Sequence, residues 1–140
     1  MNIAELLTDV AASINAMVRS MASKHNLTSS QVFHLLLIPF DGIPMSGLAR
    51  RLGLDNSTLT RNIRKLETRG VVGRQADGYD KRIKNVVLTN RGVQVVRSLE
   101  QHLEIINQNL LEQIDLDTQE HLVTSLETLS WSLDALRENQ

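Results

Sequence analysis

The stretch Leu48–Gly70, LARRLGLDNSTLTRNIRKLETRG, decides the fold of this protein. It contains six Arg and Lys residues and two acidic residues, in a chain whose formal net charge is -1. Near its centre, Leu59, Ile63 and Leu66 recur four and three residues apart. That spacing places the three side chains on one side of a helix. We therefore predict two helices, one before and one after a tight turn at Gly53.

The ends of these two helices are marked by residues that favour helix caps. Gly53 is suited to the left-handed conformation that ends a helix running from Met45 to Leu52. Asp55 can cap a second helix that runs from Asn56 to about Arg69. At about 100° per residue, the face opposite the leucines presents Ser57, Arg61, Arg64 and Thr68, with Thr60 and Lys65 at its margins.

Positive charge is concentrated in the middle of the chain. Gly42–Arg97 holds 12 Lys and Arg residues against 4 Asp and Glu, a local charge of +8, whereas the two flanks together carry -9. A segregated basic centre attracts polyanions, while acidic ends limit nonspecific association. A chance cluster on a solvated face explains the count equally well, so charge alone leaves both interpretations open.

The residues after Gly70 predict a β-hairpin. Two short apolar runs, VVGRQ at 71–75 and IKNVVL at 83–88, flank the loop ADGYDKR at 76–82, which has a basic tip. Two helices followed by such a hairpin form a winged helix-turn-helix. The predicted fold class is therefore mainly α with a small β-hairpin wing.

Amphipathic helices are predicted on both sides of this unit. An apolar stripe runs from Ile3 to Met21, and Thr28 with Gln31 forms a capping box for a helix from about Ser29 to Ile38, which Pro39 ends.

On the C-terminal side, Thr89 or Asn90 opens a long helix with apolar positions through Leu110. A last helix is expected to start in DTQE, with Asp117 as its cap and Glu120 reaching back to it.

A winged unit of about 50 residues cannot cover the apolar stripes of these long helices. They pack either on one another in a monomeric bundle or on a second copy, and the twofold symmetry of half-sites in DNA favours the second copy. We expect a homodimer in which residues 1–38 serve dimerisation and support, 39–92 form the winged DNA-binding domain, and 93–140 are C-terminal dimerisation helices.

Particular side chains are suited to double-stranded DNA. The second helix fits a major groove, where the guanidinium groups of Arg61 and Arg64 can each donate two hydrogen bonds to guanine. Other side chains are suited to contact backbone phosphates and an adjacent minor groove. They are Asn56, Ser57 and Thr58 at the helix start, Thr60 and Lys65 beside them, and Lys81, Arg82 and Lys84 on the hairpin.

The segment Ile43–Gly92, with LARRLGLDNSTLTRNIRKLETRGVV, then DKR and VVLTNRG, resembles the MarR family of bacterial and archaeal transcriptional regulators. This resemblance implies an obligate homodimer that binds a pseudo-palindromic operator, and we expect the protein to act as a repressor. It implies that Arg82 enters the minor groove and that Asp80 holds the wing in shape. It also implies a small anionic or aromatic effector, whose binding residues the sequence does not identify.

Other classes of function find no support. The chain has no Cys, and its four His residues do not form a metal-ligand pattern. No phosphate loop, paired carboxylates or activated nucleophile indicates an enzyme, so we expect no catalytic residue, cofactor or metal. With no membrane span or secretory signal, a cytoplasmic location is expected. The alternative to a regulator is a winged-helix adaptor that binds proteins and reads no bases.

Overall fold

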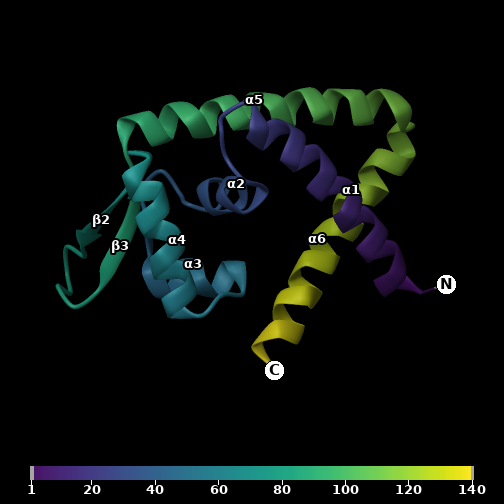
Figure 1. Ribbon diagram of the computed structural model, residues 1–140. Coiled ribbons are helices and arrows are strands. Elements are labelled where there is room, and N and C mark those ends of the chain that lie inside the picture. The colour runs from purple at the N-terminus through teal and green to yellow at the C-terminus, as the bar shows by residue number, and fades with distance from the viewer. Residues whose placement is uncertain (1, 140) are drawn as a thin grey trace. The chain divides into compact units, whose positions relative to one another are not determined.

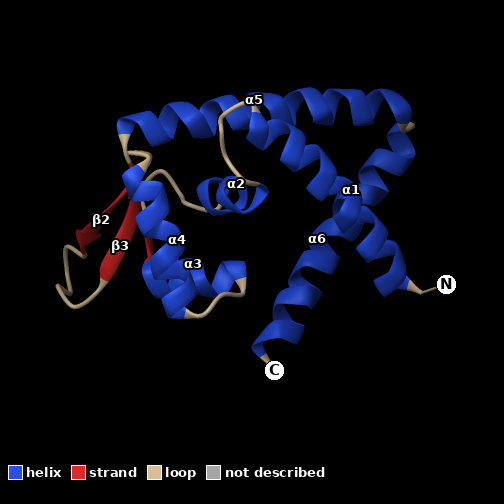
Figure 2. Ribbon diagram, viewed as in Figure 1, coloured by secondary structure: helices blue, strands red, loops and turns tan. Residues whose placement is uncertain are grey.

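The computed structural model describes residues 2–139. Its helices and strands confirm a mainly α fold with a hairpin wing, and Figures 1 and 2 show these elements within each part of the chain. In chain order they are α1 (Ile3–Ser23), α2 (Ser29–Leu36), β1 (Ile43–Pro44), α3 (Met45–Leu52), α4 (Asn56–Thr68), β2 (Val72–Ala76), β3 (Lys84–Leu88), α5 (Asn90–Gln113) and α6 (Leu116–Glu138). The chain divides into two compact units, one up to Gln101 and one from His102 onward.

The predicted capping box at the start of α2 is present. The backbone N–H of Gln31 donates to the Thr28 hydroxyl at 3.1 Å, and the N–H of Thr28 donates to the Gln31 side-chain oxygen at 3.0 Å. The helix ends at Leu36, two residues earlier than expected. Pro39 accounts for the difference, because a proline disfavours helical backbone at the residue before it.

The helix-turn-helix segment also forms as predicted. Gly53 adopts the left-handed conformation with φ of 67°, and the N–H of Leu54 donates to the carbonyl oxygen of Ala49 at 2.9 Å, which closes the end of α3. At the next helix start, the Asp55 carboxylate accepts a 2.6 Å hydrogen bond from the N–H of Thr58.

The core of the first unit lies between α4 and the elements around it. Leu59, Ile63 and Leu66 of α4 are fully buried, which confirms the inward face predicted for this helix. They share one apolar cluster with residues of α1, α2, α3, β3 and α5. Its largest fully buried side chains are Val32, Leu35, Leu48, Leu59, Ile63, Leu66, Val86 and Leu99.

A three-stranded antiparallel sheet in the order β1-β3-β2 forms the wing. Val72 pairs with Leu88 and Ala76 with Lys84 in the hairpin, and Ile43 pairs with Val86 on the other side of β3. The sequence did not predict β1, because two residues are too few to show strand alternation. Pro44 is tolerated in it because β1 is an edge strand.

One predicted helix cap is wrong. The last helix begins at Leu116, and its cap is Asp115, whose carboxylate accepts from the N–H of Thr118 at 3.0 Å. Asp117 lies instead within the first turn, where its negative charge is favourable near the positive helix end. Both aspartates precede a polar residue by three positions, and the structure selects the earlier one.

Candidate nucleic-acid interface

The outward face of α4 carries the side chains that the sequence assigned to it. Four of these side chains are exposed: Ser57, Arg61, Arg64 and Lys65. On the opposite face, Leu59, Ile63 and Leu66 are buried. The Nη2 of Arg61 donates to the hydroxyl of Thr58 at 3.3 Å, one helical turn before it. This contact limits the conformations of an otherwise solvated guanidinium group.

The start of α4 differs from the expectation in one detail. The carboxylate of Asp55 accepts the N–H of Thr58, so that N–H is not free to bind a phosphate. This bond, together with a second one to the Thr58 side chain, lowers the pKa of Asp55. The hydroxyl of Thr60 donates to the carbonyl oxygen of Asn56 at 2.8 Å, which leaves its lone pairs as acceptors.

In the wing, Arg82 and Asp80 form a two-pronged ion pair. The Nε of Arg82 lies 3.1 Å from Oδ1 of Asp80, and its Nη2 lies 3.0 Å from Oδ2. The backbone N–H of Arg82 also donates to Oδ1 at 3.0 Å. The arginine lowers the pKa of the Asp80 carboxyl. The guanidinium group is thus held by both oxygens of one carboxylate, although the Arg82 side chain is 90% exposed.

Asp77 organises the rest of the wing loop, and it was not among the predicted site residues. One of its oxygens accepts from the N–H groups of Tyr79 and Asp80, both at 3.0 Å, and the other accepts from the Asn85 side chain at 3.0 Å. The Asn85 bond is the largest cause of the lowered pKa of Asp77. The signal that could have identified it is the Asp-Gly pair at 77–78, which is typical of side-chain-stabilised turns.

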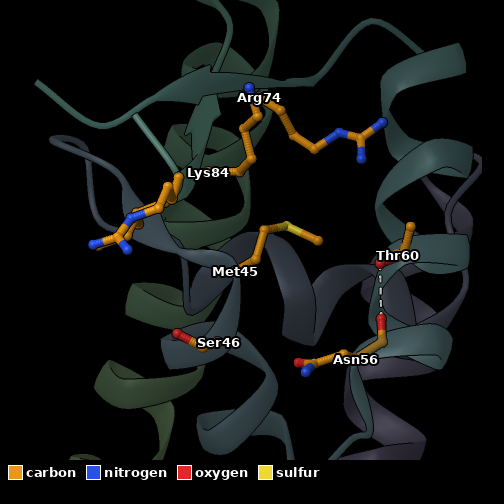
Figure 3. A pocket seen from close by; sticks show the side chains of 8 residues that line it. Met45, Ser46, Asn56, Thr60, Arg74 and Lys84 are labelled. Carbon is orange, nitrogen blue, oxygen red and sulfur yellow. Dashed lines mark hydrogen bonds between the residues drawn. The ribbon is translucent and has the colours of Figure 1, made fainter. Parts of the chain in front are cut away.

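A groove of about 370 Å³ opens between α3, the start of α4 and the wing. Figure 3 shows Asn56 and Thr60 on the α4 side, Arg74 and Lys84 on the strand side, and Met45 between them. Four of the predicted residues meet here, Asn56, Thr60, Arg82 and Lys84. Ser57, Thr58, Arg61, Arg64, Lys65 and Lys81 do not line the groove.

Four further residues of this groove were not among the candidates: Met45, Ser46, Arg74 and Ile83. Arg74 lies in β2, where its Nε is 2.7 Å from Oε1 of Glu67 near the end of α4. Three of the described residues that line the groove are basic and none is acidic, although Arg74 and Arg82 each form an ion pair with an acid outside the lining, Glu67 and Asp80. The basic cluster in the sequence contained Arg74, but only the pairing of β2 with β3 places it beside Lys84.

No three His, Asp or Glu side chains within residues 2–139 lie close enough together to hold a metal ion. Nor is any helix in that range both long and apolar enough to cross a membrane.

Comparisons with known proteins agree with this architecture. The sequence model of the MarR family matches residues 27–84. The regulator SarZ of Staphylococcus haemolyticus (strain JCSC1435) is 32% identical over 106 residues, which is 74% of this chain and 69% of SarZ. YdgJ of Bacillus subtilis (strain 168), an uncharacterised regulator of the same helix-turn-helix type, is 29% identical over 91 residues, 65% of this chain and 56% of YdgJ. Both relatives are named as helix-turn-helix transcriptional regulators.

Solved structures share the fold over almost the whole chain. The transcriptional regulator SlyA superposes with a TM-score of 0.84 at 22% identity, over 99% of this chain and 98% of SlyA. The DNA complex of S. aureus MepR gives a TM-score of 0.77 at 21% identity, over 95% of this chain and 99% of that one. With the match to SarZ and to the family model, this chain belongs to the MarR family of winged helix-turn-helix transcriptional regulators.

Proposed function

We propose that this protein is a repressor that binds a pseudo-palindromic operator as a homodimer and reads it with α4 and the wing. The observation that supports this best is the basic groove, because the start of α4 and the wing arginine line the same depression. A helix and a hairpin that flank one anionic strand of a duplex would contact a major groove and the neighbouring minor groove.

In this proposal α4 lies in the major groove. Arg61 and Arg64 donate to guanine edges, since the guanidinium fork matches the two acceptors of that base. The contact of Arg61 with the Thr58 hydroxyl supports the assignment, because a restrained side chain loses less conformational freedom on binding. Ser57 and Lys65 flank the arginines and contact the adjacent backbone.

The groove takes a backbone phosphate. Lys84 supplies positive charge on its strand side, where Arg74 adds hydrogen-bond donors beside its ion pair with Glu67. Asn56 and Thr60 supply polar groups on its helix side. The first turn of α3 also opens here at Met45 and Ser46, and within the described chain no side chain caps that helix end. Uncapped N–H groups at a helix start favour an anion. Together these groups would fix the protein's register on the duplex.

The wing reaches the minor groove. Arg82 is presented by its ion pair with Asp80, and Lys81 beside it contacts phosphate. A narrow minor groove concentrates negative potential and therefore attracts an arginine.

A second copy of the chain is needed to cover apolar surface in each compact unit. Along α1, Ile3, Val10, Ile14 and Met17 are between 40% and 60% exposed. In the unit from His102 onward, α6 has no buried residue although the structure describes all 23 of its positions. Its exposed apolar side chains include Leu122, Leu126, Leu133 and Leu136, spaced along one face. Apolar surface on that scale is typical of an oligomer interface.

We therefore assign residues 39–92 to DNA binding and residues 1–38 and 93–140 to dimerisation. Family membership also supports control by a small anionic or aromatic effector, for which we assign no binding residues. That MepR, which shares the fold, has been solved with DNA supports the assignment of the winged part.

The decisive experiment selects duplexes from fragmented genomic DNA with the full-length protein and measures affinity for the recovered fragment against random duplex of equal length. We expect a strong preference, a dimer by analytical ultracentrifugation, and a log-log salt slope of about -0.9 for each phosphate contacted. Arg97→Ala, which removes an exposed arginine of α5, is the control and should retain the preference. A protein adaptor would show neither preference nor a steep salt slope, and that result would overturn the proposal.

A further inference from the structure

One buried polar contact links α2 to α4. Among the described residues, His34 of α2 is the sole polar side chain in the buried class, with 3% of its surface exposed. Its Nε2 lies 3.1 Å from the side-chain nitrogen of Asn62 in α4, and its Nδ1 lies 2.6 Å from the carbonyl oxygen of Ser30. All of these groups belong to the first compact unit.

The geometry determines which proton the ring carries. A carbonyl oxygen can only accept, so Nδ1 of His34 carries the hydrogen and donates it to Ser30. Nε2 is then a lone pair, and the amide nitrogen of Asn62 donates to it. Burial lowers the pKa of His34, which keeps the ring neutral and the acceptor available.

This contact gives α4 a directional restraint on its rotation, which the apolar core does not provide. Leu59, Ile63 and Leu66 are fully buried, but apolar packing is non-directional, so it specifies the rotation of the helix about its axis less sharply than a hydrogen bond does. At a radius of about 6 Å, a rotation of about 10° moves an outward side chain by about 1 Å. Hydrogen bonds to base edges tolerate only a few tenths of an ångström. A directional bond between α2 and α4 can therefore hold the outward side chains of α4 within that tolerance.

We propose that His34, through its bond to Asn62, is a positioning residue that sets the rotation of α4 and thereby the sequence specificity of the protein. This inference rests on the proposed role of α4 in reading DNA. His34 itself touches no base. A second polar link lies at the end of the helix, where Nη2 of Arg69 donates to the carbonyl oxygen of His25 at 3.2 Å. These two links, together with the ion pair between Glu67 of α4 and Arg74 of β2, hold the outward face of α4 in one orientation.

The test compares His34→Leu with His34→Gln. Leucine fills the site but offers Asn62 no acceptor, whereas the glutamine oxygen can stand close to the place of Nε2. We expect His34→Leu to lose about tenfold in affinity for the genomic duplex selected by the wild type, with unchanged affinity for random duplex. His34→Gln should recover most of the loss. A purely structural role would lower the melting temperature and leave the ratio of the two affinities unchanged, which would overturn the inference.

A second measurement needs no DNA. In ¹H–¹⁵N spectra, His34→Leu should shift the amide signals along α4 (Asn56–Thr68), and the wild-type ring should show an unprotonated Nε2. Shifts confined to α2 would also overturn the inference. If the wild type prefers no duplex, the proposed function fails, while the amide shifts still decide whether His34 positions the helix.

Discussion

Gly92 in α5 lies so close to Val71 that a Cβ atom on the glycine would stand 1.9 Å from the valine carbonyl oxygen. Thr89 holds the two segments at this separation. Its hydroxyl donates to the carbonyl oxygen of Gly70 at 2.6 Å and accepts a hydrogen bond from the N–H of Gly92 at 3.0 Å. The backbone N–H of Thr89 donates to the carbonyl oxygen of Val71 at 3.1 Å. The Thr-x-x-Gly spacing at 89–92 therefore fastens the start of α5 to the end of α4.

Gly92→Ala should destabilise the protein by about 3 kcal/mol, because the clash is with backbone that no side-chain rotation can relieve. Thermal and urea unfolding of the two proteins measure the difference. Gly78→Ala is the matched control, since nothing lies within 4 Å of a Cβ at that position. Equal stability of the two variants would show that α5 can move away from Val71.

Asp55→Ala should lower the melting temperature by about 3 °C, whereas Asp55→Asn should be nearly neutral, because asparagine also caps helices. The Asp55 pKa is lowered below 3.8 by the Thr58 bonds, so its contribution to stability is present above that pH and is lost as pH falls through the folded value. Calorimetry across the acid range should find this loss reduced in Asp55→Asn. An unchanged acid profile would contradict the assignment.

Asp80→Ala should weaken binding to the selected duplex about fivefold at moderate salt, although it removes a negative charge near the phosphates. Relief of the repulsion between Asp80 and the phosphates would by itself tighten binding. We expect the loss of Arg82 orientation to outweigh that gain, because the two-pronged ion pair restrains the guanidinium group. Fluorescence anisotropy measures the sign. In an Arg82→Ala background the same change should no longer weaken binding, and a loss that persists there would exclude the mechanism.

Arg64→Ala should cost about 1 to 3 kcal/mol on the selected duplex and relax the base preference at one position in each half-site. Lys81→Ala should weaken all sequences alike and reduce the salt slope by about 1, because a phosphate contact carries no sequence information. Competition binding against a panel of single-base variants separates the two effects. Arg97→Ala should match the wild type throughout, and equal behaviour of Arg64→Ala and Lys81→Ala would argue against base reading.

His34 should make the protein less stable in mild acid. Its folded pKa lies below 6.5, so the unfolded chain takes up a proton first as pH falls, and stability is lost between 6.5 and the folded value. Urea unfolding midpoints at several pH values would measure this decrease. In His34→Gln, which has no titrating group at this position, the decrease should be smaller. A profile identical to that of the wild type would place the titration elsewhere.

Much of the fold could be predicted because its signals are local. The capping box at Thr28, the left-handed turn at Gly53 and the cap at Asp55 each depend on residues within one helical turn, and all three are confirmed. Where two local signals competed, as at Asp115 and Asp117, local chemistry was not decisive and the prediction was wrong.

The candidate site was predictable in part, for the same reason. Helical periodicity assigns Arg61 and Arg64 to the outward face of α4 without reference to the rest of the chain. It cannot show that Asn56 and Lys84 line one groove, because 28 positions separate them in the sequence. It also cannot pair His34 with Asn62.

The sequence by itself determined which segments are helices, which face of each is apolar, and where positive charge is concentrated, since these properties depend on neighbours three or four positions away. Only the tertiary structure decided which distant side chains meet: the strand β1 beside β3, Arg74 in the groove, and the histidine that bonds to α4. The physical reason is that such contacts depend on how the elements pack against one another, and the spacing of residues along the chain carries little information about that packing.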